Sequence, residues 1–319
     1  MELLETDDDS YSSKKYYVDC QELLNSTGST KDWLSRLQVL DPIYLPPRKS
    51  PVMSEKILIQ GIFEKYGEVV IKLGNTDTIE NEWIIYNKLK DNRVPGVLKY
   101  YCYFHCSEDF AKLLKTFRDN VAYKPTHLCN GPGDNLKVLL MDFGIHNLAD
   151  FPWKTTESLQ SCIKQSLLTV LQGYVSFGLY HEDCHPRNFI IKKTTKKQRE
   201  YNISGKIIDV PLYGYETCMM DLEGSKLNYP VKGIYTDLWN FCSMIENQMG
   251  EKINARNNQQ NRTQLYNMKI DLPEFNVTYI LNMVDNISQS ITLVQPNIEG
   301  GRYRLPWRKT KHLKTRKTS

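Results

Sequence analysis

The sequence lacks any apolar run that approaches the roughly 18 residues a helix needs to cross a membrane. Its first ten residues, MELLETDDDS, are acidic and lack the basic start and apolar stretch of a signal peptide. From both absences we expect an intracellular protein, cytoplasmic or nuclear, with no membrane partner. In such a reducing compartment the eight cysteines are expected to be free thiols.

Most of the chain also lacks an excess of positive charge. Lys and Arg number 41 and Asp and Glu number 37, which gives a net charge of +4. Residues 302–319 hold eight basic residues and no acidic one, so the remainder has a net charge near −4. This excludes a nucleic-acid-binding surface based on the overall charge. Residues 301–319 form a basic tail, which is expected to be disordered and is the candidate for contact with polyanions. The oligomeric state stays open.

The strand and helix patterns divide the chain into a strand-rich first part and a helix-rich second part. The predicted strands are 56–63, 68–74, 97–104, 137–142, 189–192 and 206–210. The predicted helices are 31–40, 78–90, 159–177, 237–246 and one within 272–294. The prolines between 42 and 51 are expected to interrupt regular structure, and the polar stretch 254–263 is expected to be an exposed loop. This order indicates an α+β fold of two lobes.

The loop HEDCHPRN at 181–188 follows the long predicted helix and precedes a strand. An Asp with an Asn five residues later, here Asp183 and Asn188, suits phosphoryl transfer. The carboxylate orients a hydroxyl nucleophile and accepts its proton, and the amide oxygen holds magnesium. Magnesium needs a further hard oxygen ligand. The strands 189–192 and 206–210 are expected to form a short hairpin, and Asp209, at the end of the strand KIID on its far side, is the predicted source.

The same loop resembles the H-x-D-x-x-x-x-N catalytic loop of the protein-kinase-like superfamily. VVIK, ending at Lys72, resembles the strand whose lysine holds the ATP phosphates, and ENEWIIYNKL resembles the helix that carries its glutamate partner, here Glu82. KVLLMDF at 137–143 resembles the fifth strand and hinge. Asp237-Leu238-Trp239 resembles the helix whose aspartate tethers the catalytic loop. The resemblance runs in order from about residue 56 to residue 246.

This resemblance implies a small β-rich N-lobe at about 51–145 and a mostly helical C-lobe at about 146–300, after an extension over residues 1–50. It implies ATP and Mg²⁺ as cofactors, and a hydroxyl-bearing protein or small molecule as the substrate. Lys72 and Glu82 would hold the phosphates, Val70 would face the adenine, and Gly61 would lie in the strand that covers the nucleotide. Magnesium would be held by Asn188 and Asp209.

Asp142-Phe143-Gly144 is a literal D-F-G, the sequence that carries the family's magnesium aspartate. It precedes the catalytic loop, however, whereas the family's aspartate follows it. We therefore interpret Asp142 as part of the hinge and Asp209-Val210-Pro211 as the positional match.

Several departures from the family pattern leave the kind of kinase open. No G-x-G-x-x-G precedes Lys72, and Gly61 is the only glycine of the preceding strand, which favours an inactive pseudokinase that acts as a binding module. His185 stands where protein kinases carry lysine, and either contacts phosphate or fills the loop. His-Pro-x-Asn is commoner in aminoglycoside and choline kinases, and the short 209–237 interval leaves little room for a peptide-docking segment. E-x-x-x-Y-x-x-L from Glu82 resembles casein-kinase-like chains, so a divergent Ser/Thr protein kinase is the first hypothesis.

Two other patterns have plainer interpretations. Cysteine and histidine residues with irregular spacings could suggest zinc, but part of the group lies on an apolar strand, which favours buried cysteines; the group is Cys102, His105, Cys106, His127 and Cys129. The basic run 192–199 is interpreted as a solvated turn, with contact to acidic substrates as the alternative.

Overall fold

The structure is a computed structural model that describes residues 37–44, 57–63, 67–106, 136–255, 258–271 and 274–294. The predicted tail at 301–319 and most of the predicted extension at 1–50 lie outside these residues. The chain has a mixed α+β fold, as predicted. Among the described helices, none combines the length and the apolar character that crossing a membrane requires.

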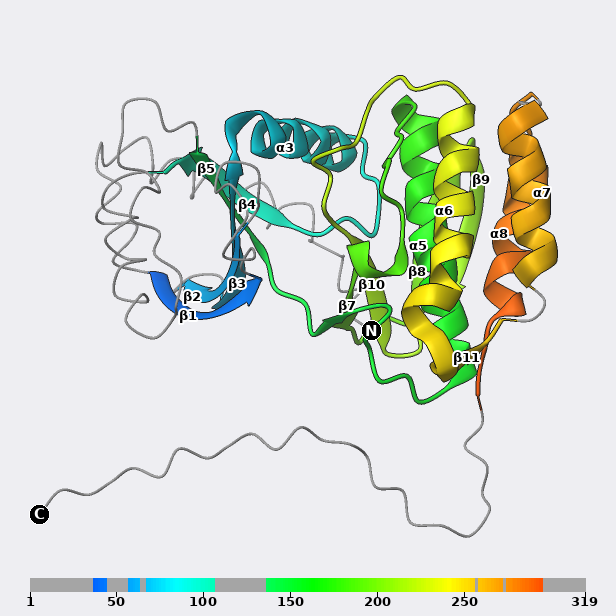
Figure 1. The fold of residues 1–319 in the computed structure, drawn as a ribbon, viewed down its shortest axis with the longest axis horizontal. Helices are drawn as coiled ribbons and strands as arrows, with labels where there is room; N and C mark the ends of the chain where they lie inside the picture. Colours follow the sequence, from blue (N-terminus) through cyan, green and yellow to red (C-terminus); the bar gives the residue numbers. More distant parts are fainter. Residues whose placement is uncertain are drawn as a thin grey trace, which may run out of the picture.

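The first part of the chain forms a five-stranded antiparallel sheet with one helix against it. The sheet order is β1-β2-β3-β5-β4, and α3 packs on β3, β4 and β5. These elements are β1 (Leu37–Tyr44), β2 (Ile57–Phe63), β3 (Gly67–Asn75), α3 (Thr76–Asp91), β4 (Tyr100–His105) and β5 (Leu136–Asp142). Figure 1 shows this sheet at the left, apart from the bundle of helices at the right.

The second part consists of four long helices and several short strands. Helices α5, α6, α7 and α8 stand side by side and contact one another (Figure 1). The elements are β6 (His146–Asn147), α5 (Thr156–Phe177), η2 (Pro186–Asn188), β7 (Phe189–Lys193), β8 (Gln198–Ile203), β9 (Lys206–Pro211), β10 (Tyr215–Met219), α6 (Lys232–Met249), η3 (Gly250–Lys252), β11 (Ile253–Asn254), α7 (Asn258–Asp271), α8 (Val277–Ser290) and β12 (Thr292–Leu293).

Residue patterning explains why the elements near the site form where they do. In β3 the side chains of Val69, Ile71 and Leu73 are buried, as the alternation predicts for one face of a strand. In α3 the predicted apolar face is buried. The N-cap of α3 is Asn75, whose side chain accepts from the N–H of Asp77.

Gly178 closes α5 in a left-handed conformation with φ 65°, where glycine is favoured. A Cβ at this position would lie 2.9 Å from Cα of Asn228. Glycine therefore lets the segment before α6 pass close to the end of α5.

Three element predictions are wrong. Residues 37–40 were expected in a helix, and Pro42 was expected to break regular structure, but both lie in β1, where the pairing with β2 shifts register around Pro42. This strand also extends the sheet into the range predicted as an extension. The stretch 254–263 was expected to be a loop, but α7 begins at Asn258 and buries Asn258, Asn261 and Leu265 against its neighbours.

The strand pairing after the loop 181–188 also differs from the prediction. The strand at 206–210, which we expected to be the partner of 189–192, pairs instead with β8 as part of β9. β7 lies between β6 and β10, and the sequence analysis did not predict β10. The β8–β9 hairpin is thus an excursion between two paired strands.

Candidate active site

Lys72 and Glu82 form a buried ion pair between the sheet and α3. Lys72 lies in the middle of β3, opposite Leu58 of β2 and Leu139 of β5. Its Nζ atom lies 2.6 Å from Glu82 Oε2, and the two side chains are 2% and 0% exposed. The other oxygen, Glu82 Oε1, accepts from the hydroxyl of Tyr100 at 2.6 Å and from the N–H of Leu222 at 3.3 Å. Glu82 therefore connects the helix, β4 and the segment after β10.

Two further carboxylates, from the segment after β10, contact the same lysine. Asp221 Oδ1 lies 2.7 Å from Lys72 Nζ, and Glu223 Oε2 lies 2.9 Å from it. Burial alone would lower the pKa of Lys72, but Glu82, Asp221 and Glu223 outweigh this and raise it, so the ammonium stays charged. In the part of the chain that the structure describes, Glu82, Asp221 and Glu223 are also the only group of three side chains close enough to share a metal ion.

The backbone brings Asp221 next to the loop 181–188. The N–H of Met220 donates to the carbonyl of Asn188 at 3.0 Å, so Asp221 is one residue beyond a direct bond to the loop. His181 Nε2 lies 3.1 Å from the carbonyl oxygen of Met220. A carbonyl oxygen can only accept, so Nε2 carries the proton in this contact.

The backbone of the loop 181–188 is held by Asp237 of α6. Its carboxylate accepts the N–H of His181 at 2.7 Å and the N–H of Glu182 at 3.1 Å. Asp237 lies inside α6 and is fully buried, so it is a tether within the helix and not the helix N-cap. Burial raises the pKa of its carboxyl, and the two N–H donors oppose that rise.

The candidate residues of the loop contact one another. The side-chain amide of Asn188 donates to the carbonyl of Asp183 at 2.8 Å and to its Oδ2 at 3.1 Å. His185 Nε2 lies 3.3 Å from the same Oδ2, whereas its Nδ1 is buried without a partner. The His185 contact, followed by that from Asn188, lowers the pKa of Asp183, so this exposed carboxylate is ionised at neutral pH.

Asp209 is not part of this cluster. It is an exposed residue of β9, and its register partner on β8 is Glu200. The prediction assumed that β9 follows β7 in the same sheet, but the chain first makes the β8–β9 hairpin and returns as β10. The aspartate that reaches Lys72 is therefore Asp221.

A turn signal in the sequence could have revealed this hairpin. Ser204 and Gly205 separate β8 from β9, and both have positive φ, 52° and 81°. Two such central residues characterise the tight turn that joins adjacent antiparallel strands. The segment KIIDV must then pair with the residues just before it, and the next strand to end near an aspartate is β10.

Val70 and Gly61, the two sheet residues predicted to lie at the nucleotide, are not part of the cluster around Lys72. Val70 is half-buried on β3 and lies opposite Gln60 and Met141. Gly61 is buried within β2 opposite Val69, in the interior of the strand and not at a turn.

The literal D-F-G segment lies at a separate place. Asp142 ends β5 and forms a close ion pair with Lys192 of β7, and its Oδ1 accepts the N–H of Phe143 at 2.9 Å. It is not among the carboxylates at Lys72. The pair also shows that Lys192, at the start of the basic run, serves within the fold, as does Arg199, which lies 2.5 Å from Glu216.

The cysteines differ in part from the prediction. Cys162, Cys184, Cys218 and Cys242 are free and buried, but Cys102 and Cys106 are disulfide-bonded, so the expectation of free thiols is wrong for these two. His127 and Cys129 of the zinc hypothesis lie outside the described residues.

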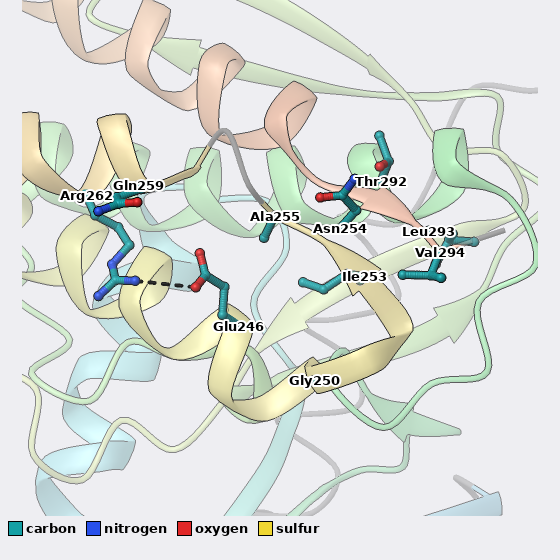
Figure 2. Close-up of a pocket in the computed structure, with 10 residues that line it drawn as sticks. All are labelled: Glu246, Gly250, Ile253, Asn254, Ala255, Gln259, Arg262, Thr292, Leu293 and Val294. Atoms are coloured by element: carbon teal, nitrogen blue, oxygen red, sulfur yellow. Dashed lines mark hydrogen bonds and ion pairs between the residues drawn. The ribbon is translucent and has the colours of Figure 1, made fainter.

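A pocket of about 790 Å³ lies between the end of α6, β11, α7 and β12 (Figure 2). Arg262 and Glu246 face each other across one side at 3.4 Å. None of the predicted site residues lines it, so concavity alone does not mark the predicted site.

Comparison with known proteins gives no match, either to a protein-family model or to a curated protein sequence.

Proposed function

We propose that this chain is an ATP- and Mg²⁺-dependent phosphotransferase that moves the γ-phosphate to a hydroxyl group, built on a two-lobed protein-kinase-like fold. The observation that carries the proposal is the joining of Lys72, Glu82 and Asp221 in one cluster, one backbone hydrogen bond away from the loop with Asp183 and Asn188. The sheet with a helix between β3 and β4, and the helical part behind it, support the proposed fold.

The donor set fits magnesium. Asp221 offers a carboxylate oxygen, and Asn188 offers its amide oxygen because the amide nitrogen is used by Asp183. Hard oxygen ligands of this kind suit Mg²⁺. When bound, ATP with magnesium supplies the phosphoryl group and part of the positive charge that offsets the phosphates.

The residues of this chain would act mainly through position and charge. Lys72, held by Glu82, presents a buried positive charge to the phosphates. Asp183 accepts the hydrogen of the acceptor hydroxyl and orients it for in-line attack, and its lowered pKa keeps it ionised for this role. Asp237 fixes the backbone of the loop on which Asp183 lies.

A protein serine or threonine is our first acceptor, and a small molecule is the second. The second is favoured by the short segment 222–231 between Asp221 and α6. It is tied to the end of α5 through Asn228 N to Phe177 O, Tyr229 N to Gly178 O, and the bridge of Lys226 with Tyr180. So short and tied a segment offers little surface for docking an extended peptide.

The test measures phosphate transfer by the full chain to a casein-like protein, aminoglycosides, choline and water. Asp183→Asn keeps the size of the side chain but removes its charge, so turnover should fall at least about a hundredfold while ATP affinity changes little. Glu182→Gln is the matched control: it neutralises the neighbouring carboxylate, which pairs with Lys226 at 2.8 Å, and should leave turnover within about threefold.

Two outcomes contradict the proposal. A parent protein that binds ATP with magnesium but transfers phosphate to no acceptor is a pseudokinase. A parent protein that binds no nucleotide is not an ATP-dependent phosphotransferase.

A further inference from the structure

The ammonium group of Lys72 faces more negative charge than one ion pair provides. Glu82, Asp221 and Glu223 each place a carboxylate oxygen within 2.9 Å of Nζ. Three carboxylates therefore share this one ammonium. An ammonium has three N–H donors, so three oxygens in contact occupy the directions from which a phosphate oxygen could approach.

The three carboxylates differ in their exposure to solvent and in their distance from Lys72 Nζ. Glu82 is fully buried and also accepts from Tyr100 and from the N–H of Leu222. Asp221 is 15% exposed and makes the shorter of the two remaining contacts, 2.7 Å. Glu223 is 33% exposed and makes the longest contact, 2.9 Å. Of the three contacts to Nζ, that of Glu223 is thus the longest and the most exposed to solvent, and it is the one that an incoming anion can reach first.

We propose that Glu223 sets the nucleotide affinity of this site, because its carboxylate occupies the side of Lys72 that the phosphates need and has to leave when they bind. This inference rests on the proposed function. Removing the charge of Glu223 then strengthens nucleotide binding. The gain is largest for ATP without magnesium, since the metal ion otherwise offsets part of the repulsion between the phosphates and the cluster. Adenosine has no phosphate, and its affinity should not change.

The experiment is a calorimetric titration of the full chain with ATP, with ATP and magnesium, and with adenosine. Glu223→Gln should bind ATP without magnesium about three- to fivefold more tightly than the parent, the scale of one partly screened charge contact. The gain should shrink when magnesium is present and be absent for adenosine. Glu223→Asp retracts the charge from Lys72 by one methylene, and should give a smaller gain in the same order of ligands.

Glu80→Gln is the matched control. Glu80 pairs with Lys137 at 3.1 Å, so a partly exposed carboxylate again contacts a nearly buried lysine, and the change in net charge is identical. Because this pair lies outside the cluster, ATP affinity should change less than twofold. A melting curve for each variant shows whether it is folded.

The remaining outcomes each overturn the inference. If Glu223→Gln and Glu223→Asp bind ATP as the parent does, or more weakly, Glu223 does not compete with phosphate, and the proposed function stands. If binding weakens only when magnesium is present, Glu223 is a metal ligand instead. If neither the parent nor any variant binds a nucleotide, the inference fails together with the proposed function.

Discussion

Two aspartates in this chain each lie beside a lysine, and only one of them belongs to the candidate active site. Asp142 begins a literal D-F-G and pairs with Lys192, a partly exposed lysine with one carboxylate partner among the contacts described. Asp221 begins D-L-E and pairs with Lys72, a buried lysine with three carboxylate partners. The local sequence would select the first, whereas the chain order and the strand pairing select the second.

The difference arises from the elements that precede each aspartate. Asp142 ends β5, which lies beside β3 and carries the chain out of the sheet. Asp221 follows β10, which lies beside β7 and therefore returns to the loop 181–188 at Asn188. The neighbouring strand, and not the two residues after the aspartate, determines which lysine it meets.

Among these aspartates, mutation of Asp221 is expected to have the largest effect on ATP binding and turnover. Asp221→Asn removes a charged oxygen ligand, so it should weaken magnesium-dependent ATP binding and lower turnover at least about a hundredfold. Asp142→Asn and Asp209→Asn are the controls. Both should retain magnesium dependence and turnover within about threefold. Turnover and ATP affinity are measured at several magnesium concentrations.

The opposite result would reverse the assignment. If Asp142→Asn loses magnesium dependence and Asp221→Asn does not, the D-F-G segment is the metal site. If Asp209→Asn loses magnesium dependence, Asp209 is the metal ligand, as the sequence predicted.

The regular elements around Lys72 could be predicted because they repeat a simple period. The strands 56–63 and 68–74 and the helix 78–90 are confirmed within two residues at each end, and β5 within one. Alternation in a strand and helical spacing in a helix reflect which face is buried. The buried face of the strands and the buried face of α3 are both strongly apolar. β1 was missed because its residues include Pro42 and its pairing with β2 is irregular.

The candidate site was predictable where short motifs resemble those of the protein-kinase-like superfamily. That resemblance implied the contact of Lys72 with Glu82 and the bonds from Asp237 to the loop, and the structure contains both. Asp221 was missed because its position depends on which strand returns to β7. Tyr100 was missed because nothing in the local sequence of β4 indicates a hydroxyl that meets Glu82.

Tyr100 also distinguishes the two regions, because its hydroxyl contacts Glu82 in the cluster at Lys72 and not the pair of Asp142 with Lys192. Burial, together with the Glu82 charge, raises the pKa of Tyr100, so its hydroxyl stays protonated and donates to Glu82. Tyr100→Phe should lower the free energy of unfolding by about 1.5–3 kcal/mol, the usual cost of losing a hydrogen bond to a buried charge. It should also weaken ATP binding.

The control for this prediction is Tyr103→Phe on the same strand, whose ring packs on Trp83 at 5.1 Å. It should change stability by less than about 0.5 kcal/mol. In a Glu82→Gln background the cost of Tyr100→Phe should shrink, since the charged partner is gone. Equal costs in both backgrounds would show that the contribution of the Tyr100 hydroxyl does not depend on the charge of Glu82.

The smallest effect concerns pH and distinguishes the two regions through their histidines. His181 is fully buried beside the backbone that leads to Asp221, whereas His146 is exposed near Asp142. Burial lowers the pKa of His181, so the folded state favours the neutral ring. The unfolded chain takes up a proton near pH 6.5, and the stabilisation present above that pH is lost as the pH falls through it.

Lowering the pH from 7.5 to 5.5 should therefore destabilise the parent, with His181 contributing about 1 kcal/mol. This contribution should be absent in His181→Gln, so the unfolding free energy of that variant should fall less steeply. His146→Gln, in the other region, should keep the parent's slope. Urea unfolding of the three proteins at both pH values measures the difference. A parallel loss in the parent and His181→Gln would mean that the ring takes up its proton without unfolding, and that burial does not favour its neutral form.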